Sequence, residues 1–139
     1  MLPALSGPAR AQDRFPDRPI RLVIPFATGG SNDVVGRLVA EGLGSRLGQT
    51  VVVENRGGAG GTIAGAFVAQ SRPDGYTLML ADLGANAIAR ELQPSVPYDP
   101  ASAFPPICHL VNLPLVLVVP ASLPVADMAG FIALARSKG

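Results

Sequence analysis

Residues 20–62, IRLVIPFATGGSNDVVGRLVAEGLGSRLGQTVVVENRGGAGGT, decide the fold of this chain. An apolar stretch at 20–26 and another at 50–54 each run into a glycine-rich turn. Each turn leads into a segment whose apolar residues recur at helical spacing. The order therefore predicts a strand, a turn and a helix, twice in succession. Such repetition is typical of an α/β domain built on a parallel sheet.

Short polar residues and a glycine mark the expected helix boundaries. Ser31 or Asn32 should cap the first helix, because a short side-chain oxygen can accept a hydrogen bond from an N–H of the first turn. Gly48 should end that helix, since glycine adopts the left-handed conformation of a C-terminal cap. Thr62 is expected to cap the second helix, which should run through Ala69.

Apolar side chains predict which helix faces are buried. Four of them lie close to one face of the first helix, and three should point inward from the second. These residues are Val35, Leu38, Val39 and Leu47, then Ile63, Ala66 and Phe67. A third strand at 77–81 and a short helix through Leu92 complete the pattern. We therefore predict a mostly parallel sheet with helices on both faces.

The remaining chain predicts a loop, two strands and a last helix. Residues 97–106 form a proline-rich loop, 107–111 and 115–119 are apolar enough for strands, and 125–136 has helical spacing. Cys108 and His109 lie in the first of these strands. Their apolar neighbours indicate that both side chains are buried.

Composition excludes several classes of function. The 139 residues are 48% apolar, which indicates one globular domain. The net charge of +1 arises without any basic run, so we expect no nucleic-acid partner. A single cysteine and a single histidine exclude a disulfide within the chain and a Cys/His zinc site, and no metal or cofactor is expected. No apolar run approaches the ~20 residues that span a bilayer, so the protein should not be membrane-embedded.

The N-terminus indicates export. Ala9, Arg10 and Ala11 have the small-x-small form of a signal-peptidase site. Residues 1–11 are therefore interpreted as the remnant of a truncated signal peptide, and 12–19 as a polar lead-in. This interpretation predicts a periplasmic location.

The two glycine turns predict an anion site. The first N–H groups of a helix have no partner within the helix, and the helix dipole is positive at this end. A carboxylate or phosphate is stabilised there. Because ligands of open α/β sheets bind beyond the carboxyl ends of the strands, Gly29 to Ser31 and Gly60 to Thr62 should converge on one ligand. A structural alternative is that glycine only gives the turns their backbone freedom.

An enzyme is not expected. His109 lies on an apolar strand, no G-x-S-x-G motif occurs, and no spacing pairs the acidic residues for acid–base chemistry. No catalytic residue is therefore assigned. A nucleotide- or phosphosugar-binding enzyme domain, using the turns as a phosphate site, remains the alternative. The second turn lacks G-x-G-x-x-G, and neither turn carries the lysine of a Walker A loop.

Three segments together carry a resemblance to a known family. They are RPIRLVIPFATGGSNDVVGRLVAEGLGSRLGQTVVVENRGGAGGTIAGAFVAQSRPDGYTL, VPYDPASAFPPI and LVLVVPASLP. From about Phe15 onward the chain resembles the Bug family, the periplasmic receptors related to the binding component of tripartite tricarboxylate transporters. The resemblance implies a type II periplasmic-binding-protein fold, with two α/β lobes around a cleft that binds small carboxylates.

The resemblance also implies a domain plan. Residues 20–104 would form the first ligand-binding lobe, and 105–139 the crossover strands and the start of a second lobe. Relatives continue through a complete second lobe, so the chain is interpreted as an N-terminal fragment with the second lobe largely missing. Its expected function is to bind a small organic carboxylate and deliver it to a tripartite tricarboxylate-type transporter or a sensor.

Site residues follow from the same resemblance, motif by motif. The first turn contributes Phe26, Thr28, Gly29, Gly30, Ser31 and Asp33. The second contributes Asn55, Ala59, Gly60, Gly61 and Thr62, and a third loop contributes Gly84 and Ala85. The chain departs from the family at Ala27-Thr28, where a proline pair is common. It departs again at 83–95, LGANAIARELQPS, where a hydroxyl-rich loop followed by Asn-Pro is typical.

Overall fold

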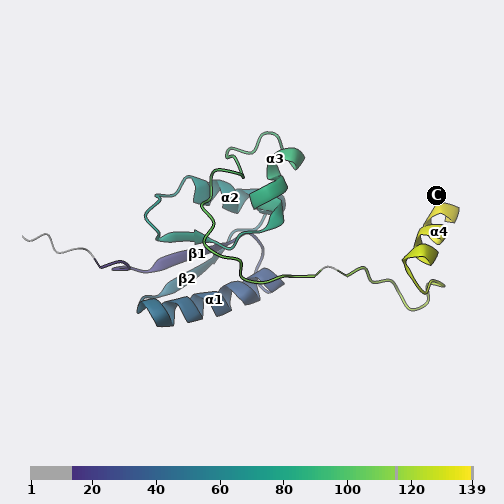
Figure 1. Cartoon of the computed structure of the whole chain (residues 1–139), viewed down its shortest axis with the longest axis horizontal. Coiled ribbons are helices and arrows are strands. Elements are labelled where there is room, and N and C mark those ends of the chain that lie inside the picture. Colours follow the sequence, from purple (N-terminus) through teal and green to yellow (C-terminus); the bar gives the residue numbers. More distant parts are fainter. Residues whose placement is uncertain (1–13, 115, 139) are drawn as a thin grey trace, which may run out of the picture. The chain divides into compact units, whose positions relative to one another are not determined.

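Three parallel strands form the centre of the structure, a computed structural model that describes residues 14–114 and 116–138. The strands are β1 (Ile20–Ile24), β2 (Val51–Asn55) and β3 (Thr77–Met79), in the order β2-β1-β3 (Figure 1). Both neighbours of β1 run parallel to it. The predicted α/β class and parallel sheet are therefore confirmed. The strands β1 and β3 are shorter than predicted, whereas β2 keeps its predicted length and begins one residue later. The strand β1 stops before Pro25, which has no N–H to donate.

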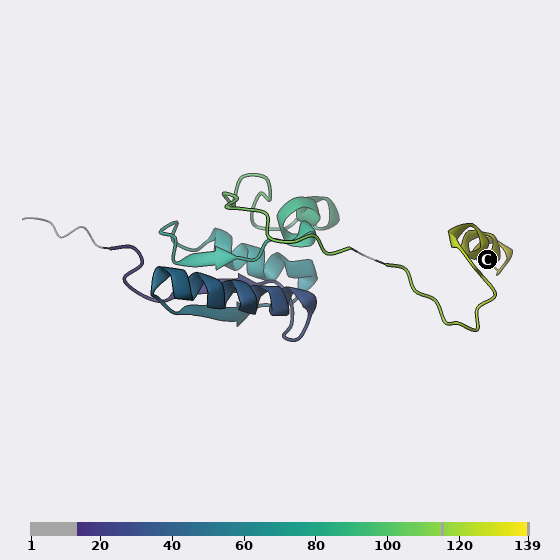
Figure 2. The ribbon, with the colours of Figure 1, turned by 60° about the horizontal axis from the view of Figure 1, so that its bottom comes forward.

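Two helices cover opposite faces of the sheet (Figure 2). They are α1 (Ser31–Leu47) and α2 (Thr62–Ala69). Side chains of one strand point alternately to the two faces, so Arg21 and Ile24 point apart. The Arg21 guanidinium lies 5.4 Å from the ring centre of Phe67 on α2, whereas Ile24 packs against Gly36 on α1. The prediction of helices on both faces is confirmed.

The face of α1 that meets the sheet consists of small residues rather than large ones. Gly36 and Ala40 are buried there, while Leu38 is 65% and Leu47 is 36% exposed. A Cβ added at Gly36 would overlap the Ile24 side chain, so the helix lies very close to β1. Leu38 and Leu47 are therefore not part of the buried face that apolar spacing indicated. A helix packed this closely on a strand has room only for small side chains at the contact.

The inward face of α2 also differs from the prediction. Ile63 is 52% exposed, whereas Ala64 and Gly65 are buried. The residue that covers Gly65 is Tyr98, which comes from the loop after α3 and is only 9% exposed. Its ring packs on Gly65, and a Cβ added there would lie 2.5 Å from Tyr98 Cζ. The proline-rich loop thus folds back onto α2, which no short-range pattern indicates.

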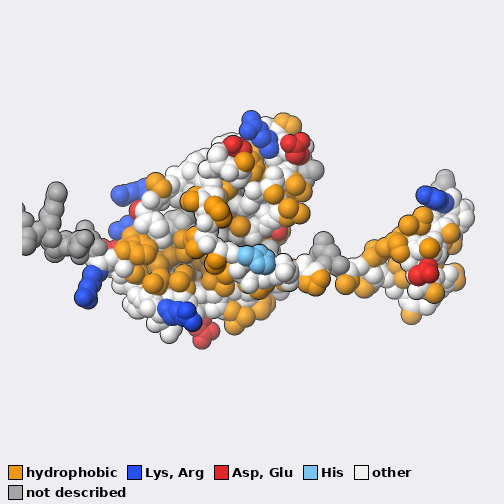
Figure 3. Space-filling model, viewed as in Figure 1, with side chains coloured by type: hydrophobic (Ala, Val, Ile, Leu, Met, Phe, Trp, Pro, Cys, Tyr) orange, Lys and Arg blue, Asp and Glu red, His pale blue; other side chains and the backbone are white. Residues whose placement is uncertain are grey.

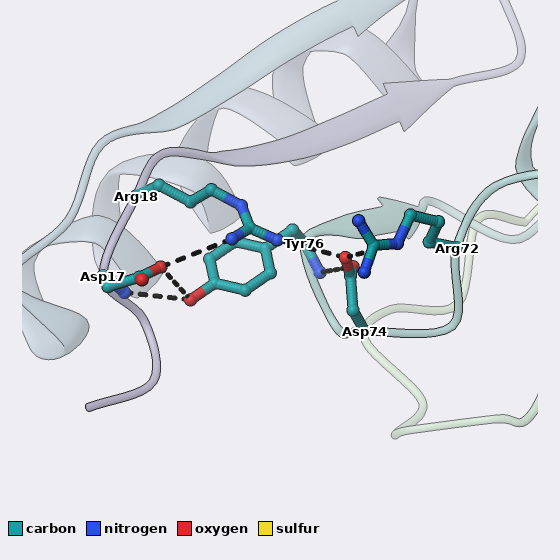
Figure 4. A network of polar contacts seen from close by, with 5 residues as sticks. All are labelled: Asp17, Arg18, Arg72, Asp74 and Tyr76. Carbon is teal, nitrogen blue, oxygen red and sulfur yellow. Dashed lines mark hydrogen bonds and ion pairs between the residues drawn. The ribbon is translucent and has the colours of Figure 1, made fainter. Parts of the chain in front are cut away.

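A polar cluster fixes the lead-in segment before β1 (Figure 4). The Asp17 amide donates to the Tyr76 hydroxyl oxygen at 2.9 Å, and that hydroxyl donates to Asp17 Oδ1 at 2.6 Å. Arg18 lies 3.7 Å from the centre of the Tyr76 ring and pairs with Asp74 at 3.1 Å, and Arg72 approaches Asp74 at 3.8 Å. Tyr76 immediately precedes β3, so the cluster lies at the edge where the strands begin. The structure describes residues 14–19 of the predicted lead-in. The predicted signal-peptide remnant at 1–11 lies outside the described residues.

The C-terminal unit begins at Ile107 and is separate from the unit that ends at Pro106. Neither predicted strand forms within 107–114 and 116–119, and Leu115 lies outside the described residues. Ile107, Val116 and Val118 are 80%, 79% and 81% exposed, and hydrophobic side chains lie at the surface of this unit (Figure 3). A strand needs a neighbour that accepts and donates its backbone hydrogen bonds, and the described residues supply none here.

Cys108 and His109 are exposed, so the prediction that both are buried is wrong. That prediction depended on the strand at 107–111. Farther along, α4 (Met128–Lys138) begins three residues later than predicted. Its start is set by Asp127, whose Oδ1 accepts a hydrogen bond of 2.8 Å from the Gly130 amide, as an N-terminal cap does. No helix among the described residues is both long and apolar enough to cross a membrane.

Candidate ligand-binding site

The two glycine turns lie at the same edge of the sheet. Ile24 and Asn55, the last residues of β1 and β2, are paired in register. The first turn (residues 25–30) and the second turn (residues 56–61) therefore leave the sheet side by side. The third loop (residues 80–85) follows β3 and leaves from the same edge, because all three strands are parallel. This is the edge where open α/β sheets bind ligands.

Neither helix at this edge has a side-chain cap. Gly30 and Gly61 are the N-cap residues of α1 and α2, and neither start receives a side-chain hydrogen bond. The predictions that Ser31 or Asn32 caps α1 and Thr62 caps α2 are therefore wrong. Ser31 and Thr62 are instead the first helical residues, and a glycine that has no side chain occupies each cap position. No side chain accepts from the first amides of either helix. At α2 the Gly61 and Thr62 amides instead donate to the backbone carbonyls of Gly58 and Ala59.

Asp33 is the central polar residue of the site. It is only 3% exposed, and its carboxylate accepts hydrogen bonds from three directions. Oδ2 accepts from the Gly29 amide at 2.9 Å and from Arg37 Nε at 3.1 Å. Oδ1 lies 3.0 Å from Arg37 Nη2 and accepts from Asn55 Nδ2 at 3.0 Å. Both oxygens are thus occupied within the protein.

Asn55 joins the first turn to β2. Its Nδ2 donates to Asp33 Oδ1 and, at 3.1 Å, to the Phe26 carbonyl oxygen. These bonds use both amide hydrogens of Asn55. The end of β2, the first turn and the start of α1 are consequently held in one arrangement. We name the residues Gly29, Asp33, Arg37 and Asn55 the Asp33 cluster.

The Asp33 cluster lowers the pKa of Asp33 from 3.8 to about 2. The hydrogen bond from Arg37 is the largest cause, followed by the one from the Gly29 amide. Both favour the ionised carboxylate, and they outweigh the opposing effect of burial.

Stability should therefore fall in acid in a way that depends on Asp33. A carboxylate with a lowered pKa stabilises the fold above its ordinary pKa of 3.8, and this contribution is lost as the pH falls toward 2. We expect the urea midpoint of the wild-type chain to fall more steeply between pH 5 and pH 2 than that of Asp33→Asn. Parallel pH profiles for the two proteins would contradict the assignment.

Arg56 connects the start of the second turn to α2. The guanidinium lies 3.7 Å from the centre of the Phe67 ring on α2, and Nε donates to Glu54 Oε1 at 2.6 Å. Its backbone amide donates to the Ile24 carbonyl oxygen at 2.8 Å. Asn55 and Arg56 are neighbours in sequence, so one connects the turn to α1 and the other connects it to α2.

The second turn and the third loop are in direct contact. Gly61 has φ +91°, and a Cβ there would lie 3.1 Å from the Cβ atoms of both Pro25 and Ala85. A Cβ at Gly84 would lie 2.9 Å from the Gly60 carbonyl oxygen. Glycine is thus required at Gly61 by conformation and by space. The hydroxyl of Thr62 is 2.9 Å from the Ala59 carbonyl oxygen and 3.3 Å from Gln93 Oε1.

Internal hydrogen bonds fix the third loop. Asp82 Oδ1 accepts from the Gly84 amide at 2.7 Å, and Asn86 Oδ1 accepts from the Asp82 amide at 3.0 Å. The Tyr98 hydroxyl donates to the Ala85 carbonyl oxygen at 2.7 Å. The chain then continues through the π turn η2 (Gly84–Ile88) into α3 (Ala89–Leu92), which confirms the predicted helix through Leu92. A π turn inside a helix often marks a functional position.

The residues predicted for the site lie on these three loops, at the end of β2 or at the adjoining helix starts, and they fall into two groups. The exposed group is Thr28, Gly29, Gly30, Ser31, Ala59 and Gly60. The buried or half-buried group is Phe26, Asp33, Asn55, Gly61, Thr62, Gly84 and Ala85. Sequence reasoning missed Arg37, Arg56 and Tyr98. Arg37 could have been found, because it follows Asp33 by four residues on a helix.

The described residues hold no cluster of three or more histidine, cysteine or acidic side chains that could bind a metal ion. The exposed polar groups of the predicted site are backbone amides and the hydroxyls of Thr28 and Ser31, while the Asp33 carboxylate is buried and bonded within the protein. This donor set suits an anion, because it offers N–H and O–H groups at two positive helix ends.

Comparison with known proteins places the chain among transport receptors. A family profile described as Tripartite tricarboxylate transporter family receptor matches residues 35–139. The chain is 40% identical over 135 residues to BugT of Bordetella pertussis, and the match covers 96% of this chain and 41% of BugT. The chain thus spans well under half the length of this curated relative.

Two solved structures have similar folds. The R. palustris protein Rpa4515 with adipate has a TM-score of 0.81 and 39% identity, over 89% of this chain and 42% of that protein. MatC from Rhodopseudomonas palustris with bound malate has a TM-score of 0.80 and 38% identity, over 88% of this chain and 42% of MatC. The α/β fold of these proteins agrees with the parallel sheet and its covering helices.

Proposed function

The chain belongs to the tripartite tricarboxylate transporter receptor family, and from this membership we propose that it binds a small organic carboxylate at the first and second turns. The resemblance seen in the sequence is confirmed by the family match. This family consists of receptors rather than enzymes. Similar proteins solved with adipate and with malate support a carboxylate as the ligand. The observation that carries the proposal is the pair of helix starts without side-chain caps at one edge of the sheet.

The proposed contacts come mainly from the exposed group of residues. The amides of Gly30 and Ser31, with the hydroxyls of Thr28 and Ser31, would hold the carboxylate from the first turn. The amides of Ala59 and Gly60 would approach it from the second. A carboxylate at a helix start gains about 0.3–2 kcal/mol, so two starts and several hydrogen bonds are needed for useful affinity.

Asp33 and Asn55 take a supporting role in this proposal. Both oxygens of Asp33 and both amide hydrogens of Asn55 already have partners within the protein. A carboxylate ligand would also be repelled by the Asp33 carboxylate. The two residues therefore serve to position the first turn, and Gly61, Thr62, Gly84 and Ala85 support the second turn in the same way.

We further propose that the receptor acts in the periplasm and delivers its ligand to a tripartite tricarboxylate-type transporter or a sensor. The family description supports the transporter, and the small-x-small sequence Ala9-Arg10-Ala11 supports export. The domain plan remains part of this proposal, with a first lobe at 20–104 and a crossover to a second lobe at 105–139.

The proposal can be tested with the 139-residue chain by recording its amide NMR spectrum during titration with succinate. We expect saturable shifts of the Gly30, Ser31 and Gly60 amides with a Kd near millimolar, which corresponds to about 4 kcal/mol. The amides of Gly42 and Gly48, in α1 and at its far end, serve as internal controls and should not move.

Inorganic phosphate and a nucleoside monophosphate form the second arm of the titration. If they shift the same amides at much lower concentration than succinate, the site is a phosphate site and the alternative of a nucleotide- or phosphosugar-binding domain is correct. If no anion moves these amides, the glycine turns have only a structural role.

A further inference from the structure

The second turn is positioned by packing rather than by hydrogen bonds to other loops. Its Gly61 amide donates to the Gly58 carbonyl at 2.9 Å, and its Ala59 carbonyl accepts from the Thr62 hydroxyl at 2.9 Å. Both bonds are local. Among the described residues, no hydrogen bond joins residues 57–61 to another loop. The positions of their amides therefore depend on the groups that pack against the turn.

The third loop is one of these packing neighbours. A Cβ at Gly61 would lie 3.1 Å from the Ala85 Cβ, and a Cβ at Gly84 would lie 2.9 Å from the Gly60 carbonyl oxygen. Neither glycine could carry a side chain without displacing the other loop. The two loops thus have no spare room between them, and a shift of the third loop is transmitted to Gly60 and Gly61.

Tyr98 holds the third loop at Ala85. Its hydroxyl donates to the Ala85 carbonyl oxygen at 2.7 Å. Burial raises the pKa of Tyr98 above its ordinary value of 10.0, so the hydroxyl stays protonated and able to donate. The ring is itself fixed, because it packs on Gly65 of α2 and meets Phe104 edge to face, with the ring centres 5.3 Å apart. Tyr98 therefore ties the third loop to the helix that follows the second turn.

We propose that Tyr98 is a positioning residue of the ligand site, and that it acts by holding the third loop against the second turn. This inference rests on the proposed function, in which amides of the second turn bind a carboxylate. Tyr98 acts from within the fold, since its ring is buried and its hydroxyl is bonded to Ala85. The proline-rich loop at 97–106 thereby contributes to the affinity of the site.

Tyr98→Phe tests the proposal, because it removes the hydroxyl and keeps the ring. In the 139-residue chain without ligand, we expect the buried Gly61 amide to exchange with solvent at least about fivefold faster than in the wild type, since losing one hydrogen bond makes local opening easier. In amide NMR titrations, succinate should bind the variant at least about fivefold more weakly, because displaced amides bind a carboxylate less well.

Ser71→Ala is the matched control. The Ser71 hydroxyl donates to the Phe67 carbonyl oxygen at 2.9 Å, at the end of α2 away from the second turn. Both variants lose one bond from a hydroxyl to a backbone carbonyl, so their urea midpoints should fall by similar amounts. Only Tyr98→Phe should change the exchange of the Gly61 amide and the affinity for succinate.

Three results would overturn this inference while the carboxylate-binding proposal stands. Tyr98→Phe could bind succinate as tightly as the wild-type chain, it could leave the exchange of the Gly61 amide unchanged, or Ser71→Ala could weaken binding equally. Each would show that Tyr98 has only a structural role. If succinate moves neither the Gly30 nor the Gly60 amide of the wild-type chain, the proposed function fails and this inference fails with it.

Discussion

Replacing Asp33 with alanine is expected to weaken carboxylate binding at least about tenfold, although the change removes a negative charge beside the anion site. Alanine leaves the Gly29 amide, Arg37 and Asn55 without their shared acceptor. The first turn then keeps only the hydrogen bond from Asn55 to the Phe26 carbonyl as its side-chain connection to β2. Its amides are therefore held less firmly toward the ligand. Small misplacements of positioned groups have effects of this size. Titration of the variant with succinate measures the change.

Glu41→Ala provides the control for charge. Glu41 lies on the same helix, is exposed, and carries the same charge as Asp33. Its removal should leave the affinity for succinate unchanged or slightly raised, because repulsion of the anion falls. If Asp33→Ala also binds succinate as well as or better than the wild type, charge repulsion dominates and Asp33 does not position the turn.

Gly65→Val is expected to destabilise the fold by about 3 kcal/mol, the upper end of the usual cost of adding atoms to a packed core. A Cβ at Gly65 would overlap the Tyr98 hydroxyl and lie 2.9 Å from Cε1 of its ring. Either the ring or α2 must move, and the hydrogen bond from Tyr98 to the Ala85 carbonyl is then lost. Urea unfolding followed by circular dichroism measures the free energy of unfolding.

Gly42→Val is the matched control, because it makes the same change in a helix where a Cβ meets nothing within 4 Å. Its effect should stay within about 0.5 kcal/mol, as helix propensity alone predicts. In the double variant Gly65→Val/Tyr98→Ala the two losses should not add, since both remove the same contact. Equal free energies of unfolding for Gly65→Val and Gly42→Val would show that Tyr98 does not pack on α2.

The sheet and its two helices could be predicted from sequence because local signals define them. Apolar runs, glycine turns and helical spacing are all properties of a few neighbouring residues. The buried faces could not be predicted so well. Gly36 and Ala40 face β1 because the helix lies close to the strand, and that distance is set by Ile24 on another element. The apolar character of Ile63 predicts an inward position, yet Ile63 is 52% exposed and Gly65 is the residue that packs against Tyr98.

The strands predicted at 107–111 and 115–119 show the limit of local reasoning in another way. Their apolar residues suit a strand, but a strand exists only beside a partner, and the described residues offer none. Cys108 and His109 were predicted to be buried on the same reasoning and are exposed. For the candidate site, the sequence predicted the turns and the shared edge. It did not predict that both oxygens of Asp33 and both amide hydrogens of Asn55 would be hydrogen-bonded within the protein.

The hydrogen bonds of the Asp33 cluster are all made within the protein, and this affects the rates of binding. The first turn need not rearrange before a carboxylate can engage it, so we expect the association rate not to be slowed by a folding step in this turn. Related ligands that share a carboxylate should then associate at similar rates. Differences in their affinity would arise in the dissociation rate, as is usual among complexes that form at one preformed site. The lifetime of the complex, rather than the speed of capture, would distinguish one acid from another.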